Sequence, residues 1–591
     1  MKILHPHKLA LGLFHFNPHW GADPICTQRH CTEGLGPFLK VVEAHPDWKL
    51  SLEISGSGLE ILAKHYKKPF DRLGSLVKSG QLELISSLYT PSLWVAFPRH
   101  DLVRSIEENL EVLKRYDLPS NRIFFAQEAF FGEGVRRLKE YFDVAVCKDD
   151  YLDYFYEIDY QHPVWKLGDL RVVVASGHLL CESVSVMRND PCFLRNSGLS
   201  YRHQSYLDSV KVLNEQVNFP NRTGSSESVI WHWYHCGDGN HFCTISKPWN
   251  HEMSFFDEAW TRWNEELLAR LQSIGYEFSF VRGLCDAVEP GSDQPLPPLI
   301  EGSWNSRESG GVARWMGRHS NPWENDNRIL TCTARARSRL IDAERRIRLA
   351  NDTDLEIQWD KRVKQAWREI LTAECSDYLG WSPSPTGMAT AFQSVELALK
   401  HASEIYDEFA PNHVKDTTRH RVLPSDRPPT CFTSSPIIFG AVGDGGWNQL
   451  YQDCWMWEVR FRSTERECGV RFLLSCDHLE FSPSGDEMRL MQIPLNLLKP
   501  STVSLPLANG LIKLDHECYL IKNLAYIHIA AEVRKDPQTI TFSVNGDPQG
   551  HEHAWTFYLV KGSSDRALTI ANAINYCDYQ GKSRIKHENS M

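Results

Sequence analysis

Positive charge is scarce in this chain of 591 residues, which has 64 Lys and Arg against 75 Asp and Glu and a net charge of −11. A nucleic-acid-binding surface needs a basic face, so we expect no nucleic-acid partner. Long apolar runs are missing too, because no stretch approaches the roughly 20 residues that span a bilayer. We therefore expect no membrane partner.

We also expect neither a secretory leader nor a disulfide framework. Positions 1–8 carry little positive charge, and the apolar stretch 9–16 lacks a small-residue cleavage site, so we expect a buried first strand there. The 16 cysteines are scattered without a CxxC pair, which is typical of free thiols in a reducing compartment. These features predict a cytoplasmic protein.

Short apolar strands and amphipathic helices alternate from residue 9 to about 290. The expected strands lie at 9–17, 49–55, 82–86, 123–126, 144–147, 171–175, 229–234 and 276–281. The expected helices lie at 33–45, 59–66, 70–79, 101–116, 135–141 and 255–274. This alternation predicts a parallel sheet with right-handed crossovers. Its length favours a barrel, which we assign to a catalytic domain at 1–300.

Two further regions follow the alternating segment. Residues 301–410 have a helical pattern, and the polar, proline-rich stretch 411–430 predicts a linker. Strand-like segments then recur at short spacing, which predicts a β-sandwich domain over 431–591. We expect its body, 431–575, to be a separate unit that supports the enzyme or binds polymer.

Glu128 is the first candidate for chemistry. It follows the expected strand 123–126 and precedes a glycine-containing turn at 132–134. In α/β barrels the carboxyl ends of the strands carry the catalytic groups. Taken alone, however, a carboxylate in this place more often caps the next helix through the helix dipole.

Polar and aromatic side chains gather in four other segments near the ends of expected strands. These segments contain His15, Asn17, His19 and Trp20; Glu83 and Tyr89; His235, Asp238 and His241; and Trp304. Each has an ordinary structural explanation, such as a strand running into a turn or a Gly-Asp-Gly turn. For Glu83 we favour a buried structural pair, and for Trp304 we favour packing at a domain junction.

The segment of Glu128 and the four other segments, taken in chain order, resemble motifs of glycoside hydrolase family 57. The first three are as follows. His15-Phe-Asn-Pro-His19 is similar to the family's His-Phe-His-Gln-Pro. Gly80-Gln-Leu-Glu-Leu84 and Tyr89-Thr-Pro91 are similar to its Gly-Gln-Val-Glu-Leu and Tyr-x-Pro. Gln127-Glu128 corresponds to the Pro-Glu that carries the nucleophile.

The remaining motifs follow in the same order. Asp238-Gly-Asn-His-Phe242 resembles the Asp-Gly-Glu-Lys-Phe that carries the acid/base, and Gly302-Ser303-Trp304 resembles a segment of the branching-enzyme-like members. The stretch 366–377 resembles their helical domain, so the resemblance covers about 9 to 380. The chain departs from the family at Asn17, Gln127 and Asn240-His241, where the motifs have His, Pro and Glu-Lys.

The resemblance implies an incomplete (β/α)7-type barrel followed by a helical domain and a C-terminal β-sandwich. It also implies a retaining α-glycoside hydrolase or transglycosidase that acts on α-glucan or related α-linked oligosaccharides, like the α-amylases, branching enzymes and α-galactosidases of the family. Glu128 would attack the anomeric carbon, and Asp238 would protonate the leaving oxygen and then activate water or an acceptor sugar. Retention requires the two carboxyl groups to lie roughly 5–5.5 Å apart, and it requires no metal or cofactor.

The side chains expected to bind the sugar come from the same motifs and their neighbours. They are His15, Asn17, His19, Trp20, Glu83, Tyr89, Trp94, His235, His241 and Trp304. The departures at Asn17, Gln127 and Asn240-His241 line the expected sugar site, so they leave the identity of the sugar open.

Two other classes of protein stay open. A metal-dependent sugar deacetylase on a similar barrel would use His15, His19, Asp23 and His235 as ligands, although the chain has no HExxH motif. A carbohydrate-binding protein without catalysis would account for the departures from the motifs. Metal analysis would test the first class, and turnover of an activated glycoside would exclude the second.

Overall fold

The structure is a computed structural model. It describes residues 9–18, 24–157, 164–175, 244–245, 255–256, 265, 268–269, 272–273, 277–287, 294–303, 306, 311–312, 315, 323–350, 353–379, 385–408, 423–424, 436–451, 453–462, 467–486, 489–507, 510–522, 531–544 and 552–575. In this part of the chain, no helix is long and apolar enough to cross a membrane.

Parallel strands form the first part of the fold. Strand β2 (Leu13–Phe16) pairs with β3 (Leu50–Ile54), and β3 pairs with β4 (Leu82–Ile85). Strand β1 (Leu9–Leu11) precedes β2 directly and pairs in parallel with β11 (Glu277–Ser279) on its other side. The N-terminal stretch therefore pairs with two distant parts of the chain, through β1 with β11 and through β2 with β3.

A second sheet continues the parallel arrangement. Strands β5 (Ile123–Phe124), β6 (Val144–Lys148) and β8 (Leu170–Ala175) pair in this order. An antiparallel strand, β7 (Val164–Leu167), which the sequence pattern did not predict, joins β8 to β12 (Gln294–Pro295).

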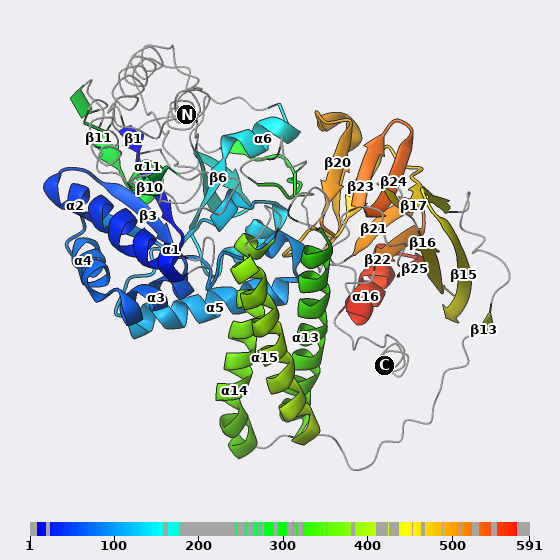
Figure 1. The fold of residues 1–591 in the computed structure, drawn as a ribbon. Helices are drawn as coiled ribbons and strands as arrows, with labels where there is room; N and C mark the ends of the chain where they lie inside the picture. Colours follow the sequence, from blue (N-terminus) through cyan, green and yellow to red (C-terminus); the bar gives the residue numbers. More distant parts are fainter. Residues whose placement is uncertain are drawn as a thin grey trace.

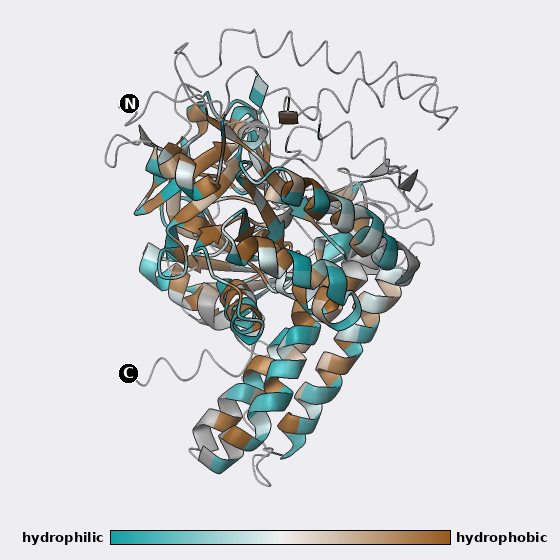
Figure 2. Ribbon diagram, turned by 90° about the vertical axis from the view of Figure 1, so that its left-hand side faces the viewer, coloured by the Kyte–Doolittle hydropathy of each residue, from teal (hydrophilic) through white to brown (hydrophobic). Residues whose placement is uncertain are grey.

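Side chains and helices complete the first part. The Ser87 hydroxyl, just beyond β4, donates to the Ile123 carbonyl at 3.0 Å and accepts from the Phe125 amide at 2.9 Å, so the two sheets are neighbours. The flanking helices in Figure 1 are α2 (Gly36–Ala44), α3 (Gly56–His65), α4 (Lys67–Lys78) and α5 (Arg99–Arg115). Figure 2 shows hydrophobic strands inside this body and hydrophilic faces on its helices. A mixed α/β architecture is confirmed.

Three long helices form a bundle that extends away from this body (Figure 1). They are α13 (Trp323–Ala350), α14 (Thr353–Ala373) and α15 (Pro385–Glu408), and all three lie within the region 301–410 that was expected to be helical. Their contact faces are lined by alanines and larger apolar side chains such as Leu340 and Trp367, so the helices can approach closely.

Two antiparallel sheets form the C-terminal region. One has the order β13-β15-β16-β25-β22-β21-β18-β19 and the other the order β14-β17-β24-β23-β20. Their strands are β13 (Leu423–Pro424), β14 (Ile437–Phe439), β15 (Val442–Tyr451), β16 (Cys454–Arg462), β17 (Cys468–Leu473), β18 (His478–Phe481), β19 (Met491–Pro494), β20 (Thr502–Leu505), β21 (Leu511–Asp515), β22 (Cys518–Lys522), β23 (Ala531–Lys535), β24 (Gln538–Val544) and β25 (Glu552–Lys561).

Aromatic side chains join the two C-terminal sheets face to face. The rings of Trp457 and Phe472, on different sheets, lie 5.8 Å apart edge to face. The hydrophobic cluster that contains these rings also contains Phe124 of β5 and Val146 of β6. The C-terminal region therefore shares a hydrophobic core with the parallel strands, and the expectation of a separate unit stays a prediction.

Three local expectations need correction. Residues 255–274 were expected to be one helix, but β10 (Phe255–Phe256) pairs with β9 (Thr244–Ile245) as a short antiparallel ladder. The helix expected at 135–141 is a tighter 3-10 helix at Glu133–Leu138. The expected linker 411–430 contributes β13, whose backbone pairs with β15.

Candidate functional site

Glu128 lies in a strained turn. The backbone is left-handed at two consecutive non-glycine residues, with φ +59° and ψ +12° at Glu128 and φ +48° at Ala129. Each such residue costs on the order of 1–3 kcal/mol, and persists only where the surrounding structure enforces it. Strain of this kind is concentrated at functional sites, which favours a chemical role for Glu128 over simple helix capping.

Buried aromatic side chains hold the turn on its C-terminal side. The Phe130 ring packs edge to face on Trp315, with ring centres 5.5 Å apart. The backbone of Phe131 pairs with that of Gly302 through two hydrogen bonds, of 3.0 and 2.9 Å. The half-buried Glu128 is therefore presented by a loop whose following residues are fixed in the core.

The ends of β2 and β3 bring a second group of polar side chains together. His15 is buried, and its Nδ1 lies 2.6 Å from a carboxylate oxygen of Glu53 on the neighbouring strand. This contact sets the orientation of the imidazole ring. Burial raises the pKa of Glu53, although the hydrogen bond and charge of His15 oppose the shift.

The segment after α14 completes this group. Asn17 Nδ2 donates to Asp377 Oδ2 at 2.8 Å, and the Cys375 thiol lies 3.2 Å from the same oxygen. The segment is held beside the loop after β4, because the Ser376 amide donates to the Pro91 carbonyl at 2.7 Å. A segment from the helical bundle thus reaches the ends of the first strands.

Electrostatics connects this group to Glu128. Burial raises the pKa of the Cys375 thiol well above its usual range, and the charges of Asp377 and Glu128 contribute to the shift. Burial also raises the pKa of Asp377, against the hydrogen bonds from Asn17 and Cys375 and the charge of His15. The charge of Glu128 therefore acts on Cys375, whose thiol is bonded to Asp377, the partner of Asn17.

Glu83 is not placed in this site. Its carboxylate accepts from the Ser51 hydroxyl at 2.6 Å and from the Val281 amide at 2.9 Å. Burial raises its pKa, and these hydrogen bonds oppose the shift. The expectation that Glu83 binds sugar is corrected to a structural role, because its carboxylate joins β4 to β3 and to the start of α11 (Val281–Asp286).

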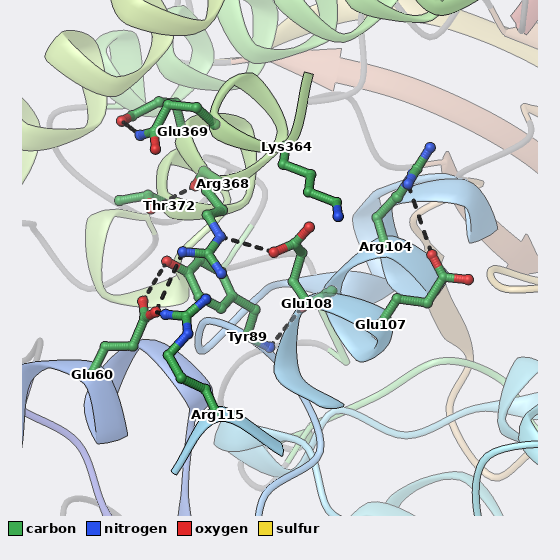
Figure 3. A network of polar contacts seen from close by, with 12 residues as sticks. Glu60, Tyr89, Arg104, Glu107, Glu108, Arg115, Lys364, Arg368, Glu369 and Thr372 are labelled. Carbon is green, nitrogen blue, oxygen red and sulfur yellow. Dashed lines mark hydrogen bonds and ion pairs between the residues drawn. The ribbon is translucent and has the colours of Figure 1, made fainter. Parts of the chain in front are cut away.

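Tyr89 also has a structural role. Its hydroxyl donates to Glu60 at 3.0 Å, and the guanidinium of Arg368 lies over its ring, 5.2 Å from the ring centre (Figure 3). Arg368 also donates to Glu108 at 2.8 Å and to Glu60 at 3.3 Å. Figure 3 shows Tyr89 inside this network between α3, α5 and α14.

Trp94 is a core residue rather than a stacking platform for sugar. Its side chain is 1% exposed, and its indole N–H donates to the Phe130 carbonyl at 3.2 Å. Its edge packs on Phe124. Trp94 therefore binds the backbone that follows the Glu128 turn, which corrects its assignment to the sugar site.

The other predicted site residues lie outside the described part of the chain. They are Asp238, His19, Trp20, His235, His241 and Trp304. The alternative metal ligand Asp23 lies outside it as well. Within the described ranges, no group of three or more His, Cys, Asp and Glu side chains is arranged to hold a metal ion.

Sequence reasoning missed Glu53, Cys375 and Asp377. Glu53 sits in an apolar strand, and such a buried carboxylate is costly unless paired, so its place in β3 was a usable signal. Asp377 is 360 residues from its partner Asn17. Nothing local in the sequence marks that pairing.

Comparisons with known proteins agree with the resemblance over one segment. The model for glycosyl hydrolase family 57 matches residues 28–141, which include Glu128. An alpha-amylase of Pyrococcus horikoshii is 30% identical over 115 residues, and a 4-alpha-glucanotransferase of Thermococcus litoralis is 27% identical over 115 residues. Each match covers 20% of this chain and only 18% of the relative. The predicted resemblance to the family is confirmed for this segment.

Solved structures extend the likeness of fold. An alpha-mannosidase from Enterococcus faecalis V583 has a TM-score of 0.56 at 9% identity, over 95% of this chain and 87% of that protein. A family 57-type branching enzyme from Pyrococcus horikoshii has a TM-score of 0.49 at 13% identity, over 68% of this chain and 89% of that one. The first of these shows a shared fold along nearly the whole chain.

Proposed function

We propose that this chain is a retaining α-glycoside hydrolase or transglycosidase that acts on α-glucan or related α-linked oligosaccharides. Glu128 is the nucleophile and Asp238 the acid/base, on an incomplete (β/α)7-type barrel with domains at 1–300, 301–410 and 431–591 joined by 411–430. The matched family segment and the amylase and glucanotransferase relatives support the α-glucan class.

The strained turn at Glu128 is the observation that carries the proposal. A carboxylate that attacks an anomeric carbon must be aimed at one point, and the left-handed backbone at Glu128 and Ala129 fixes its direction. His15 and Asn17, which belong to the first motif of the resemblance, are already held by Glu53 and Asp377. Preorganised hydrogen-bonding groups next to a nucleophile suit a substrate rich in hydroxyls.

In the proposed reaction, Glu128 forms a bond to the anomeric carbon while the glycosidic oxygen leaves with the proton of Asp238. Asp238 then takes a proton from water or from an acceptor hydroxyl, whose oxygen displaces Glu128.

Replacing Glu128 tests the nucleophile. Glu128→Gln should lower kcat by about 10³-fold or more on an aryl α-glycoside, because no covalent intermediate can form. Azide should restore part of the activity of Glu128→Ala and yield a glycosyl azide. Glu140→Gln, an exposed carboxylate nearby, is the matched control. Near-normal turnover by Glu128→Gln would overturn the assignment.

Replacing Asp238 tests the acid/base. A good leaving group departs without a proton, so Asp238→Ala should lose activity on an oligosaccharide yet form the glycosyl-enzyme from a glycosyl fluoride. That intermediate should accumulate, because the base that activates water is gone. An equal loss on every leaving group would place the acid elsewhere.

A substrate panel settles the sugar and the outcome. Aryl α-glucoside, α-galactoside and α-mannoside would be compared, the last because a protein of similar fold is named for that activity. Following the product anomer by NMR separates retention from inversion, and an added acceptor sugar separates transfer from hydrolysis. Release of acetate with stoichiometric metal, and no glycoside turnover, would instead support the deacetylase.

A further inference from the structure

A buried cluster of charged groups lies just before the segment that carries Asp377. Glu374 follows the last residue of α14, Asp101 lies in the first turn of α5, and Arg337 lies on α13. All three side chains are at most 5% exposed. Arg337 Nε donates to Asp101 Oδ2, and its Nη2 donates to Glu374 Oε1 at 2.9 Å.

The cluster holds two carboxyl groups and one guanidinium. Arg337 uses one oxygen of each carboxyl, and the other two oxygens, Asp101 Oδ1 and Glu374 Oε2, are buried without a hydrogen-bond donor. The two carboxyl groups lie side by side, because neighbouring nitrogens of one guanidinium bind them. One proton held between them satisfies both oxygens and leaves a single negative charge to balance Arg337.

The surroundings agree with one ionised and one neutral carboxyl. Burial and the charge of Asp101 raise the pKa of Glu374 well above its usual range, although Arg337 opposes the shift. Burial works against ionisation of Asp101 too, but Arg337 outweighs it and holds that pKa at about 2. His100 faces the cluster from α5, with Nδ1 3.5 Å from Asp101 Oδ1, and Cys375 follows Glu374 in the chain.

The cluster is joined to the candidate site by a short stretch of backbone. The Glu374 carbonyl accepts from the Leu93 amide at 3.1 Å, and Ser92 and Cys375 form an isolated antiparallel bridge. Asp377, two residues after Cys375, accepts a hydrogen bond from the Asn17 amide. A displacement of Glu374 is therefore passed to Asp377 through a segment only four residues long.

We propose that Asp101, Glu374 and Arg337 are positioning residues, in which one proton shared by the two carboxyl groups holds residues 374–377 so that Asp377 meets Asn17. The cluster acts through Asp377 and does not touch substrate. Where activity is the readout, the inference rests on the proposed function, so the tests below include measurements that need no substrate.

The shared proton makes a distinctive prediction for amide substitutions. In Glu374→Gln, the amide N–H takes the place of the proton and Asp101 still balances Arg337. In Asp101→Asn, Glu374 loses its proton and balances Arg337 in turn. Each single variant should therefore stay close to the wild type. The double variant Asp101→Asn, Glu374→Gln leaves Arg337 without a counter-charge, so its effect should far exceed the sum of the two.

Infrared difference spectra of the full chain test the proton directly. Wild type minus Glu374→Gln, and wild type minus Asp101→Asn, should each show the C=O band of one buried protonated carboxyl. If neither difference spectrum contains this band, the two groups share no proton and the inference is overturned.

Hydrogen exchange tests the positioning role. Peptides that contain the amides of Leu93 and Ser376 should exchange faster in the double variant and remain as slow as wild type in the single variants. kcat/KM on the best glycoside of the panel should fall about tenfold or more only in the double variant, because a small misplacement of a site residue is costly. Arg362→Gln, which breaks an exposed ion pair on the same bundle, is the matched control.

Three outcomes remain distinguishable. Unchanged exchange and unchanged kcat/KM in a folded double variant would overturn the positioning role. If the wild type turns over no glycoside, the proposed function fails, and the infrared and exchange results still decide this inference. If the double variant does not fold, Glu374→Ala supplies the exchange measurement, because Asp101 still balances Arg337 while the Glu374 carboxyl is gone; slow exchange there would overturn the inference.

Discussion

The helical bundle and the C-terminal sheets each meet the α/β part of the fold at buried carboxyl groups. The carboxyl groups on the bundle side bind a buried arginine, whereas the carboxyl group on the C-terminal side binds a backbone amide. On the bundle side, Arg337 lies between Asp101 and Glu374 and balances one negative charge. On the C-terminal side, Glu301 accepts from the Ser484 amide at 2.7 Å, and the hydrogen bonds described for its carboxylate include none from a cation.

The two junctions also lead to different parts of the candidate site. The Arg337 cluster adjoins the segment of Asp377, whereas Glu301 adjoins the loop of Glu128. A Cβ added to Gly132 of that loop would lie 3.0 Å from Glu301 Cγ, and the neighbouring Gly302 pairs with Phe131. The comparison teaches that a cation can keep a buried carboxylate charged, while a carboxyl buried without one changes its protonation near neutral pH.

Removing the cation from the bundle junction should have the largest effect. Arg337→Met leaves Asp101 and Glu374 buried without their counter-charge, and breaking a buried ion pair in this way costs about 3–5 kcal/mol. The loss should appear as a lower midpoint of thermal unfolding, followed by circular dichroism. Arg362→Met, at an exposed ion pair of the same bundle, should shift the midpoint little. Equal shifts in the two variants would contradict the importance of burial.

The C-terminal junction should respond to pH instead. Burial raises the pKa of Glu301 to about 7 from an unfolded value of 4.5, although the hydrogen bond from the Ser484 amide opposes the shift. The folded protein therefore binds more protons between these values, so the stability from neutral Glu301 is fully present below pH 4.5 and is lost as pH rises through 7. The corresponding free energy is about 3 kcal/mol.

The measurement compares melting temperatures of wild type and Glu301→Gln at about pH 5 and pH 8. The amide stays neutral at both values, so the fall in melting temperature should be smaller in Glu301→Gln than in wild type. Arg362→Met should retain the wild-type pH dependence, because its exposed ion pair with Glu404 does not contain Glu301. An unchanged pH response in Glu301→Gln would show that Glu301 is not the titrating group.

The partly exposed network at Arg368 should give the smallest effect of the three junctions. Arg368 is 20% exposed, and its partners Glu60 and Glu108 are 21% and 7% exposed (Figure 3). Partial exposure screens these pairs, so Arg368→Ala should cost only about 1 kcal/mol. Hydrogen exchange at the Ser376 amide should not change in Arg368→Ala, although Arg368 lies on α14, the helix that precedes the segment of Asp377. Faster exchange there would mean that any contact of α14, buried or exposed, positions the segment of Asp377.

Regular periodicity allowed much of the architecture to be predicted from the sequence. The apolar side of α5, with Leu102, Ile106 and Leu113, is buried, and the three bundle helices lie within the region 301–410 that was expected to be helical. These features depend on side chains a few residues apart, which a helix or strand brings to one face whatever the rest of the chain does. The family segment around Glu128 was recognisable for the same reason, because its motif is local.

The tertiary structure alone decided which polar residues share the site. His15 meets Glu53 from 38 residues away, and Asn17 meets Asp377 from 360 residues away. Glu83, Tyr89 and Trp94 have the residue types of a sugar site, yet their polar atoms bind neighbouring segments of the α/β part of the fold. A polar side chain has the same local pattern in either role, because its partner is set by how distant elements pack.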